Sequence, residues 1–123
     1  FVSVRRKNKE AFYDLICPYN QLITQKEIGY SSWFGFSILI SEECTFTRKE
    51  ILDVFAKNNI ETRPIVSGNI LNKKMMKYFD YTTYGDMDAS EYIDKYGFFI
   101  GNSHKNLSRE FEYLSSALKE IFK

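Results

Sequence analysis

The sequence lacks the features that mark several common classes of protein. It contains no run of about 18 apolar residues, so it predicts no membrane-spanning helix. The charged segment at residues 1–9 leads into no apolar stretch, so we also expect no signal peptide. The two cysteines, Cys17 and Cys44, are spaced neither as a CxxC motif nor as a zinc site. We therefore expect two reduced thiols in a cytoplasmic protein.

The sequence also lacks an excess of one charge and any complete catalytic motif. Its 17 basic and 16 acidic residues give a formal net charge of +1, whereas a nucleic-acid-binding domain usually carries a clear basic excess. No GxSxG nucleophile elbow, Walker-type phosphate loop or dinucleotide-binding glycine pattern occurs. The single histidine, His104, belongs to no group with metal-ligand spacing. We predict no catalytic residue, no metal site and no nucleic-acid partner for this chain.

What the sequence does contain is the apolar material for one domain, residues 1–123. Hydrophobic residues make up 44% of the chain and aromatic residues 17%, which argues against disorder. Periodicity predicts alternating helices and strands. The predicted helices cover residues 1–16, 47–59, 70–79, 88–95 and 108–121, and the predicted strands cover 31–40, 60–66 and 96–101, with a further short strand near Leu22.

Local signals place the ends of several of these elements. Thr47 and Glu50 form a capping box at the start of one helix, and Asn58-Asn59 can close it. Ser108 is the expected cap of the last helix. Pro64 has no N–H, so its strand should lie at a sheet edge or should need no ladder bond there. Helical spacing in the 70–79 segment predicts an inward face made of Ile70, Leu71, Met75 and Phe79.

The order of elements describes an α+β or α/β sandwich with a small sheet of about three strands and helices on one or both faces. The strand at 31–40 is apolar on both faces towards its end, which favours a central position. This pattern leaves the strand directions open.

Three clusters of residues stand out where predicted strands begin or end. The first consists of Ser31, Ser32, Trp33 and Phe34. The second consists of Arg63, Ser67, Gly68 and Asn69, and the third of Gly101, Asn102, Ser103 and His104. An arginine suits planar, bidentate binding of a phosphate or carboxylate, and Gly68 would let a ligand approach the backbone. Strand ends are also where sheet-based sites tend to lie. Each cluster also has an interpretation without a ligand: the first would be a packed aromatic, the second a turn with a surface arginine, and the third an ordinary surface histidine.

Together these stretches resemble a known family. "SWFGF" at the start of a strand, "FTRKEI", "NNIETRP", "GN", "GFFIG" and "LSREFEYLSSAL" are similar to the C-terminal small domain of the pyridoxal-phosphate-dependent sugar aminotransferases of the DegT/DnrJ/EryC1/StrS group. "TRPIVSGN" together with "SWFGF" favours the sugar-nucleotide 3-dehydratase branch of that group, which acts in lipopolysaccharide sugar synthesis. The resemblance runs from about residue 1 to residue 123.

The resemblance implies a fold for this chain and a separate large domain that binds the cofactor. It implies an α+β domain with a small, mainly antiparallel sheet flanked by helices, as in fold-type I transferases. The cofactor, pyridoxal 5′-phosphate or pyridoxamine 5′-phosphate, would sit mainly on a large domain that this chain lacks, so we expect none bound here. The whole protein would be a homodimer acting on a nucleotide-linked 4-keto-6-deoxyhexose, by 3-dehydration or transamination.

The resemblance also implies roles for the clusters. Arg63, Ser67 and Asn69, with Gly68 between them, would contact the sugar or a nucleotide phosphate at the edge of the cleft. The other expected substrate-binding residues are Trp33 and Phe34 as walls, with Asn102 and His104 as neighbours. A different interpretation is an RNA-binding module that stacks bases on its aromatic strands. A non-catalytic interaction module is a third.

Overall fold

A four-stranded antiparallel sheet forms the centre of the computed structural model, which describes all 123 residues from Phe1 to Lys123. The strands lie in the order β1-β2-β4-β3. The strands are β1 (Leu22–Thr24), β2 (Gly35–Ile40), β3 (Thr62–Arg63) and β4 (Gly97–Gly101), and the helices are α1 (Val2–Ile16), α2 (Arg48–Lys57), α3 (Asp88–Tyr96) and α4 (Ser108–Ile121), with 3₁₀ helices η1 (Ile70–Asn72) and η2 (Lys74–Tyr78). The α+β class and the antiparallel sheet are confirmed, with the short strand β1 as a fourth member.

Strand β2 is central, as its apolar pattern predicted, because it pairs with β1 on one side and β4 on the other. Strand β3 is the edge strand that Pro64 predicted. The predicted extent of that strand, residues 60–66, was wrong, since only Thr62 and Arg63 pair with β4. A turn ends the strand: Val66 has a φ of 49°, and the Gly68 N–H donates to the Ile65 carbonyl at 2.9 Å.

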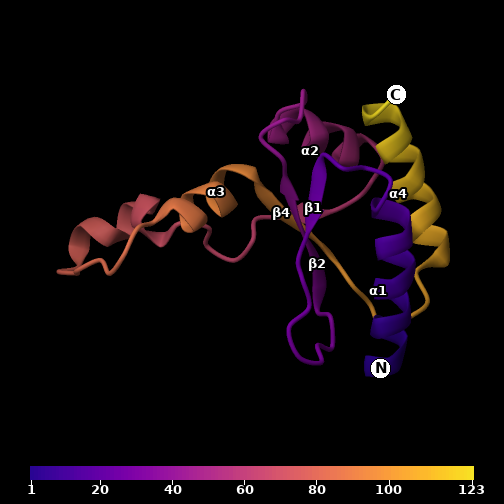
Figure 1. Ribbon diagram of the computed structural model, residues 1–123, viewed down its shortest axis with the longest axis horizontal. Helices are drawn as coiled ribbons and strands as arrows, with labels where there is room; N and C mark the ends of the chain where they lie inside the picture. Colours follow the sequence, from indigo (N-terminus) through magenta and orange to yellow (C-terminus); the bar gives the residue numbers. More distant parts are fainter.

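The hydrophobic core lies between the sheet and three helices, α1, α2 and α4, which gather on one side of it (Figure 1). Alternate residues of β2 and β4 face these helices, because side chains along a strand point to opposite faces in turn. Phe36 stacks on Phe12 of α1 with ring centroids 4.2 Å apart, and Phe98 meets Phe55 of α2 edge to face at 5.7 Å. Each such buried side chain contributes about 1.5–3 kcal/mol.

The helix ends show which local signals hold. Thr47 and Glu50 make both bonds of the predicted capping box. Asn59 closes α2 in the left-handed conformation, with a φ of 57°. The predicted cap of α4 was wrong: Ser108 is the first helical residue, and its N–H donates to Asn106 Oδ1 at 2.8 Å. No helix has the length and the apolar character needed to cross a membrane.

Residues 65–87 leave the sheet and form an arm that projects from the body on the side opposite α1 and α4 (Figure 1). The predicted helix over 70–79 was wrong, since the segment forms the two short 3₁₀ helices instead. Its expected inward face is also wrong in part: Ile70, Met75 and Phe79 are each about half exposed. The arm extends out and returns to the body through α3, so these side chains have no core of this chain to pack against.

Candidate functional site

The face of the sheet opposite α1, α2 and α4 is covered in part by Ile65 and by α3 near Gly97, and we call it the open sheet face. It carries Ser37, Phe99 and Arg63, which occupy one row across β2, β4 and β3. Paired residues of an antiparallel sheet share a face, so this row lies opposite the helical core. The exposed ring of Phe34 joins the row, 6.4 Å from the ring of Phe99. The open sheet face therefore combines aromatic surface with one guanidinium group.

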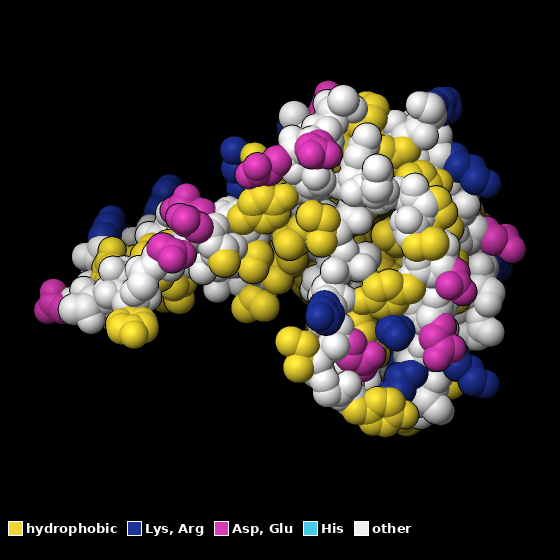
Figure 2. Space-filling view, in the orientation of Figure 1, with side chains coloured by type: hydrophobic (Ala, Val, Ile, Leu, Met, Phe, Trp, Pro, Cys, Tyr) yellow, Lys and Arg dark blue, Asp and Glu magenta, His cyan; other side chains and the backbone are white.

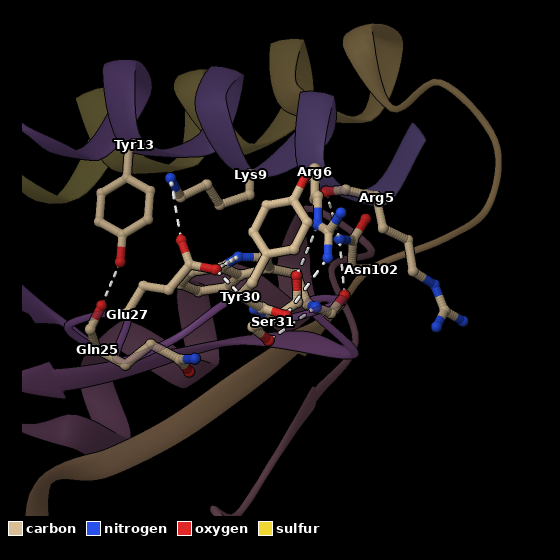
Figure 3. Close-up of polar contacts among 10 residues, drawn as sticks. Arg5, Arg6, Lys9, Tyr13, Gln25, Glu27, Tyr30, Ser31 and Asn102 are labelled. Carbon is tan, nitrogen blue, oxygen red and sulfur yellow. Dashed lines mark hydrogen bonds and ion pairs between the residues drawn. The ribbon is translucent and has the colours of Figure 1, made fainter. Parts of the chain in front are cut away.

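In the loop between β1 and β2, the Glu27 carboxylate accepts several hydrogen bonds. Glu27 Oε1 accepts the Ser31 N–H at 2.8 Å and the indole N–H of Trp33 at 3.1 Å. Lys9 of α1 lies 3.7 Å from the other oxygen of Glu27 (Figure 3). These bonds favour the charged form, so the pKa of Glu27 lies below its usual range, with the Ser31 N–H as the largest cause.

Arg6 of helix α1 also forms hydrogen bonds to this loop. The Arg6 Nε donates to the Ser31 carbonyl at 2.9 Å, and its guanidinium lies 3.1 Å from the centroid of the Tyr30 ring (Figure 3). The Tyr13 hydroxyl donates to the Gln25 carbonyl further along the loop. Side chains of α1 thus bond to several points along the loop, while the Tyr30 ring stays mostly exposed.

Asn102, one of the predicted site residues, joins β4 to α1 and to the start of β2. Its amide donates to the carbonyls of Arg5 at 3.0 Å and Trp33 at 2.9 Å, and its backbone N–H donates to the Phe34 carbonyl at 3.2 Å. Asn8 of α1, which is 5% exposed, donates in turn to Asn102 Oδ1 at 3.0 Å. The predicted grouping of Trp33, Phe34 and Asn102 is therefore present.

Within that group Trp33 differs from the expectation. Its side chain is only 2% exposed and lies in the core, so it supports the loop from beneath and does not form an open wall. Its backbone has a φ of 55°, a conformation that is rare for a bulky residue. Phe34, the next residue, is 74% exposed and is the member of the pair that faces outward. His104 is exposed and meets the ring of Phe1 at 4.8 Å, away from the open sheet face.

The structure does not bring Arg63 and Asn69 to one pocket. Arg63 donates through Nε and Nη2 to the same Glu61 oxygen, at 3.0 and 2.6 Å, on the exposed sheet edge. Asn69 is 2% exposed, and both ends of its amide are used within the chain. It accepts the Leu71 N–H at 3.0 Å and donates to Glu91 of α3 at 3.2 Å.

Gly68 and Asn69 belong instead to the root of the arm, where it meets α3. Asp94 of α3 accepts from Lys73 at 3.0 Å and from Asn72 at 3.3 Å. The hydrogen bond from Lys73 is the largest cause that holds the pKa of Asp94 below its usual range. Ser67 is exposed on the preceding turn. A role of these residues, or of Arg63, in binding substrate remains a prediction.

Several residues that organise the site were not predicted from the sequence. They are Arg6, Asn8, Glu27, Asp94 and Phe99. Asn8 had a signal, because it stands four residues from both Val4 and Phe12 on the apolar stripe of α1. A polar residue on such a stripe indicates a buried hydrogen-bonding role.

A cavity of about 570 Å³ lies elsewhere, between the end of α2 and the start of α4. It is lined in part by Ile60, Leu107 and Phe111, and it contains none of the predicted site residues. Because its lining is mostly apolar and its charged groups, Glu61 and Glu110, are both acidic, it does not suit a phosphate-bearing ligand. The open sheet face remains the better candidate.

Three lysines of the chain, Lys49, Lys73 and Lys95, are hydrogen-bonded to neighbouring side chains. A lysine that forms a Schiff base needs a lowered pKa. The pKa values of Lys49 and Lys95 are raised, mainly by hydrogen bonds to Asp53 and Tyr96. Lys73 is held by Asp94. Lys49 and Lys95 are therefore poor candidates for a Schiff base.

Comparisons with known proteins give a consistent result. No protein-family model matches the chain. The GDP-4-keto-6-deoxy-D-mannose 3-dehydratase of Escherichia coli O55:H7 is 46% identical over 120 residues, which is 97% of this chain and 31% of that protein. The protein of the same name from Yersinia pseudotuberculosis is 42% identical over 121 residues, 98% of this chain and 31% of that protein.

Solved structures agree with these matches. The E. coli GDP-4-keto-6-deoxy-D-mannose-3-dehydratase with bound hydrated pyridoxal phosphate superposes with a TM-score of 0.89 at 45% identity, over 96% of this chain and 31% of that one. A Streptoalloteichus hindustanus aminotransferase, 12% identical with a TM-score of 0.68 over 100% of this chain and 33% of that one, shares the fold. The chain thus spans about a third of the length of its relatives. The resemblance seen in the sequence is confirmed: the chain corresponds to the C-terminal domain of the sugar-nucleotide 3-dehydratases, relatives of the sugar aminotransferases.

Proposed function

We propose that this chain is the C-terminal domain of a pyridoxal-phosphate-dependent enzyme that removes the 3-hydroxyl group of GDP-4-keto-6-deoxymannose. The observation that carries the proposal is the 46% identity across 97% of the chain to a dehydratase of that substrate. A Salmonella typhimurium lipopolysaccharide biosynthesis protein is also similar, at 26% identity over 74% of this chain and 21% of that protein. The product would therefore serve lipopolysaccharide sugar synthesis.

In this proposal the open sheet face forms one wall of the substrate cleft, and the remainder of the protein forms the other. Phe34 and Phe99 would provide apolar contact area for a sugar or base. Arg63 would exchange its exposed bond to Glu61 for a phosphate oxygen, since a guanidinium matches the planar oxygens of phosphate well. Glu27, Arg6 and Asn102 would act by positioning the loop and Phe34.

The cofactor and the assembly lie outside what this chain contains. We propose that pyridoxal phosphate is anchored by the rest of the protein, because this chain spans only 31% of the relative solved with that cofactor bound. We propose also that the whole protein is a homodimer in the cytoplasm. The comparisons give no support to RNA binding, and the near-neutral charge disfavours it.

The test is to assay the protein at its natural length with GDP-4-keto-6-deoxymannose, pyridoxal phosphate and an amino donor. We expect mass spectrometry to find a sugar nucleotide that has lost the 3-hydroxyl oxygen and keeps its 4-keto group. A product with an amino group in place of the keto oxygen would instead establish a transaminase. In parallel, the 123-residue chain alone should show neither pyridoxal absorbance nor turnover, and activity of that chain would refute the division of labour.

A further inference from the structure

Gly101, at the end of β4, is a glycine that nothing in this chain requires. Each of the other glycines has a positive φ or a neighbouring atom where a Cβ would stand; they are Gly29, Gly35, Gly68, Gly85 and Gly97. At Gly101 the φ is not positive, and a Cβ atom would have nothing within 4 Å. Glycine in a strand is less favourable than alanine, and it often marks a point where a ligand approaches the backbone closely.

The bare backbone at Gly101 adjoins two aromatic rings. Gly101 pairs with Gly35 of β2 and stands two residues from Phe99, so it belongs to the open sheet face. The Phe99 ring lies against Gly35, where a Cβ atom would be 2.9 Å from it, and the Phe34 ring follows at 6.4 Å. Aromatic surface beside bare backbone suits a ligand ring with apolar faces, such as a hexose.

The open sheet face lies on the same side of the body as the arm, opposite α1 and α4 (Figure 1). Figure 2 shows that the molecule is hollowed on this side, between the arm and the body. Hydrophobic side chains line the lower side of the arm and continue to its junction with the body. The shape of the chain therefore leaves room for a ligand in front of this face.

The ion pair between Arg63 and Glu61 lies on the other side of Gly101. Because Thr62 pairs with Ile100, the antiparallel register sets Glu61 next to Gly101. Arg63 Nη2 donates to Glu61 Oε1 at 2.6 Å. Glu61 and Gly101 also both line the cavity of about 570 Å³, so open space reaches this point of the sheet. A phosphate bound to Arg63 would leave the sugar attached to it within reach of Gly101.

We propose that Gly101 determines specificity for the substrate of the proposed function, on which this inference rests. The hexose ring of the nucleotide sugar lies over the backbone of Gly101 and beside Phe34, while Arg63 binds phosphate. Packing of the rest of the protein onto this point would instead bury the Arg63–Glu61 pair and remove two charges from water, which is costly. A phosphate makes use of the guanidinium and leaves the pair near solvent.

Gly101→Ala and Gly101→Val in the protein at its natural length test the position of the hexose. We expect KM for GDP-4-keto-6-deoxymannose to rise about tenfold with alanine and further with valine, because the added methyl groups take the place of the sugar. GDP has the base and the phosphates but no hexose, so its inhibition constant should stay unchanged in both variants. Arg63→Ala should weaken the binding of GDP and of the sugar nucleotide alike.

Thermal unfolding of the same proteins without ligand separates binding from folding. A Cβ atom at residue 101 meets no atom of this chain, so the unfolding temperature of Gly101→Ala should equal or exceed that of the parent. Gly35→Ala is the contrast, because its Cβ would meet Phe99, and it should lower the unfolding temperature. A lowered value for Gly101→Ala would mean that protein packs at this point, and it would refute the inference.

Glu110→Gln is the control for the cavity, because Glu110 lines it from α4 and lies away from the open sheet face. Its KM should equal that of the parent, and an increase like that of Gly101→Ala would place the hexose in the cavity and refute the inference. An unaltered KM in Gly101→Ala refutes it as well, as does an equal loss of GDP affinity. A parent protein that does not turn over the sugar nucleotide would refute the proposed function itself.

Discussion

Gly68 lies directly against Asp94 at the root of the arm. A Cβ atom at residue 68 would come within 1.9 Å of Asp94 Oδ1, and the φ of Gly68 is +59°. Both conditions exclude side chains, the first by contact and the second by backbone conformation. The glycine that follows the edge strand is therefore explained by the close approach of the arm to α3, and no ligand is required for it.

Replacing Gly68 with Ala should weaken the attachment of the arm. We expect a loss of about 1–3 kcal/mol, because the substitution combines an unfavourable φ with a displaced Asp94. Hydrogen exchange of the arm amides and chemical unfolding would measure the local and global effects. Gly85→Ala is the matched control, since Gly85 has a φ of +73° but no atom within 4 Å of its Cβ position. Equal effects of the two substitutions would refute the role of the contact with Asp94.

The loop beside the open sheet face should loosen in acid because of Glu27. Its pKa is lowered by the folded structure, so its contribution to stability is complete above the ordinary glutamate value of about 4.3 and is lost as the pH falls through the lower folded value. Trp33 is the only tryptophan of the chain and bonds to Glu27. Its emission should therefore shift to longer wavelength only below the pH at which an ordinary glutamate titrates.

Glu27→Gln provides the control for this transition. Glutamine keeps an oxygen that can accept from Ser31 and Trp33 but does not titrate, so the acid-dependent shift of the Trp33 emission should disappear. The assignment to Glu27 fails if the variant shows the same transition, or if the midpoint in the parent chain lies above the ordinary glutamate value.

The buried amide of Asn8 should be one of the most sensitive polar positions in the chain. Its Nδ2 bonds to Asn102 Oδ1 and to the carbonyls of Ser103 and Lys105, at 2.8–3.2 Å, and its Oδ1 accepts the Leu107 N–H at 3.3 Å. Asn8→Ala removes all of these partners and should cost about 2–4 kcal/mol of unfolding free energy.

Urea unfolding of the 123-residue chain would measure that cost. Asn20→Ala is the control, because Asn20 is exposed and forms no side-chain hydrogen bond within the chain, and it should change stability by less than about 0.5 kcal/mol. Similar values for the two variants would mean that water replaces the bonds of Asn8, and that α1 is not tied to the loop after β4.

The parts of the fold that were predictable are those whose signals are local. The Thr47–Glu50 box is a contact between residues three apart, and the alternation in β2 reports burial of one face. The arm was mispredicted because Ile70, Met75 and Phe79 have helical spacing but no surface in this chain to pack on. Spacing predicts which residues share a face, but burial depends on tertiary contacts outside the segment.

The site was partly predictable for the same reason. The resemblance grouped Phe34, at the start of a predicted strand, with Asn102, at the end of another, and the antiparallel pairing of β2 and β4 brings these two points together. Glu27 was missed because its partners come from α1 and from both sides of a turn, which no spacing rule connects. The resemblance implied that Asn69 contacts the substrate, but it could not show that the amide is buried and bonded to Glu91.

Arg63 offers the sharpest test of the substrate cleft. Its only partner in the chain is the exposed Glu61, and exposed ion pairs contribute little to stability, so Arg63→Ala should leave the unfolding free energy within about 0.5 kcal/mol. In the protein at its natural length the same change should raise KM for the sugar nucleotide about tenfold or more, because a charge-assisted contact to phosphate would be lost. Arg63→Lys should recover only part of that loss, since an ammonium group cannot make the forked contact.

Lys57→Ala removes a comparable exposed pair with Glu120 on another face and should leave KM unchanged. Steady-state kinetics of the three variants would decide, and an unaltered KM in Arg63→Ala would remove this residue from the cleft.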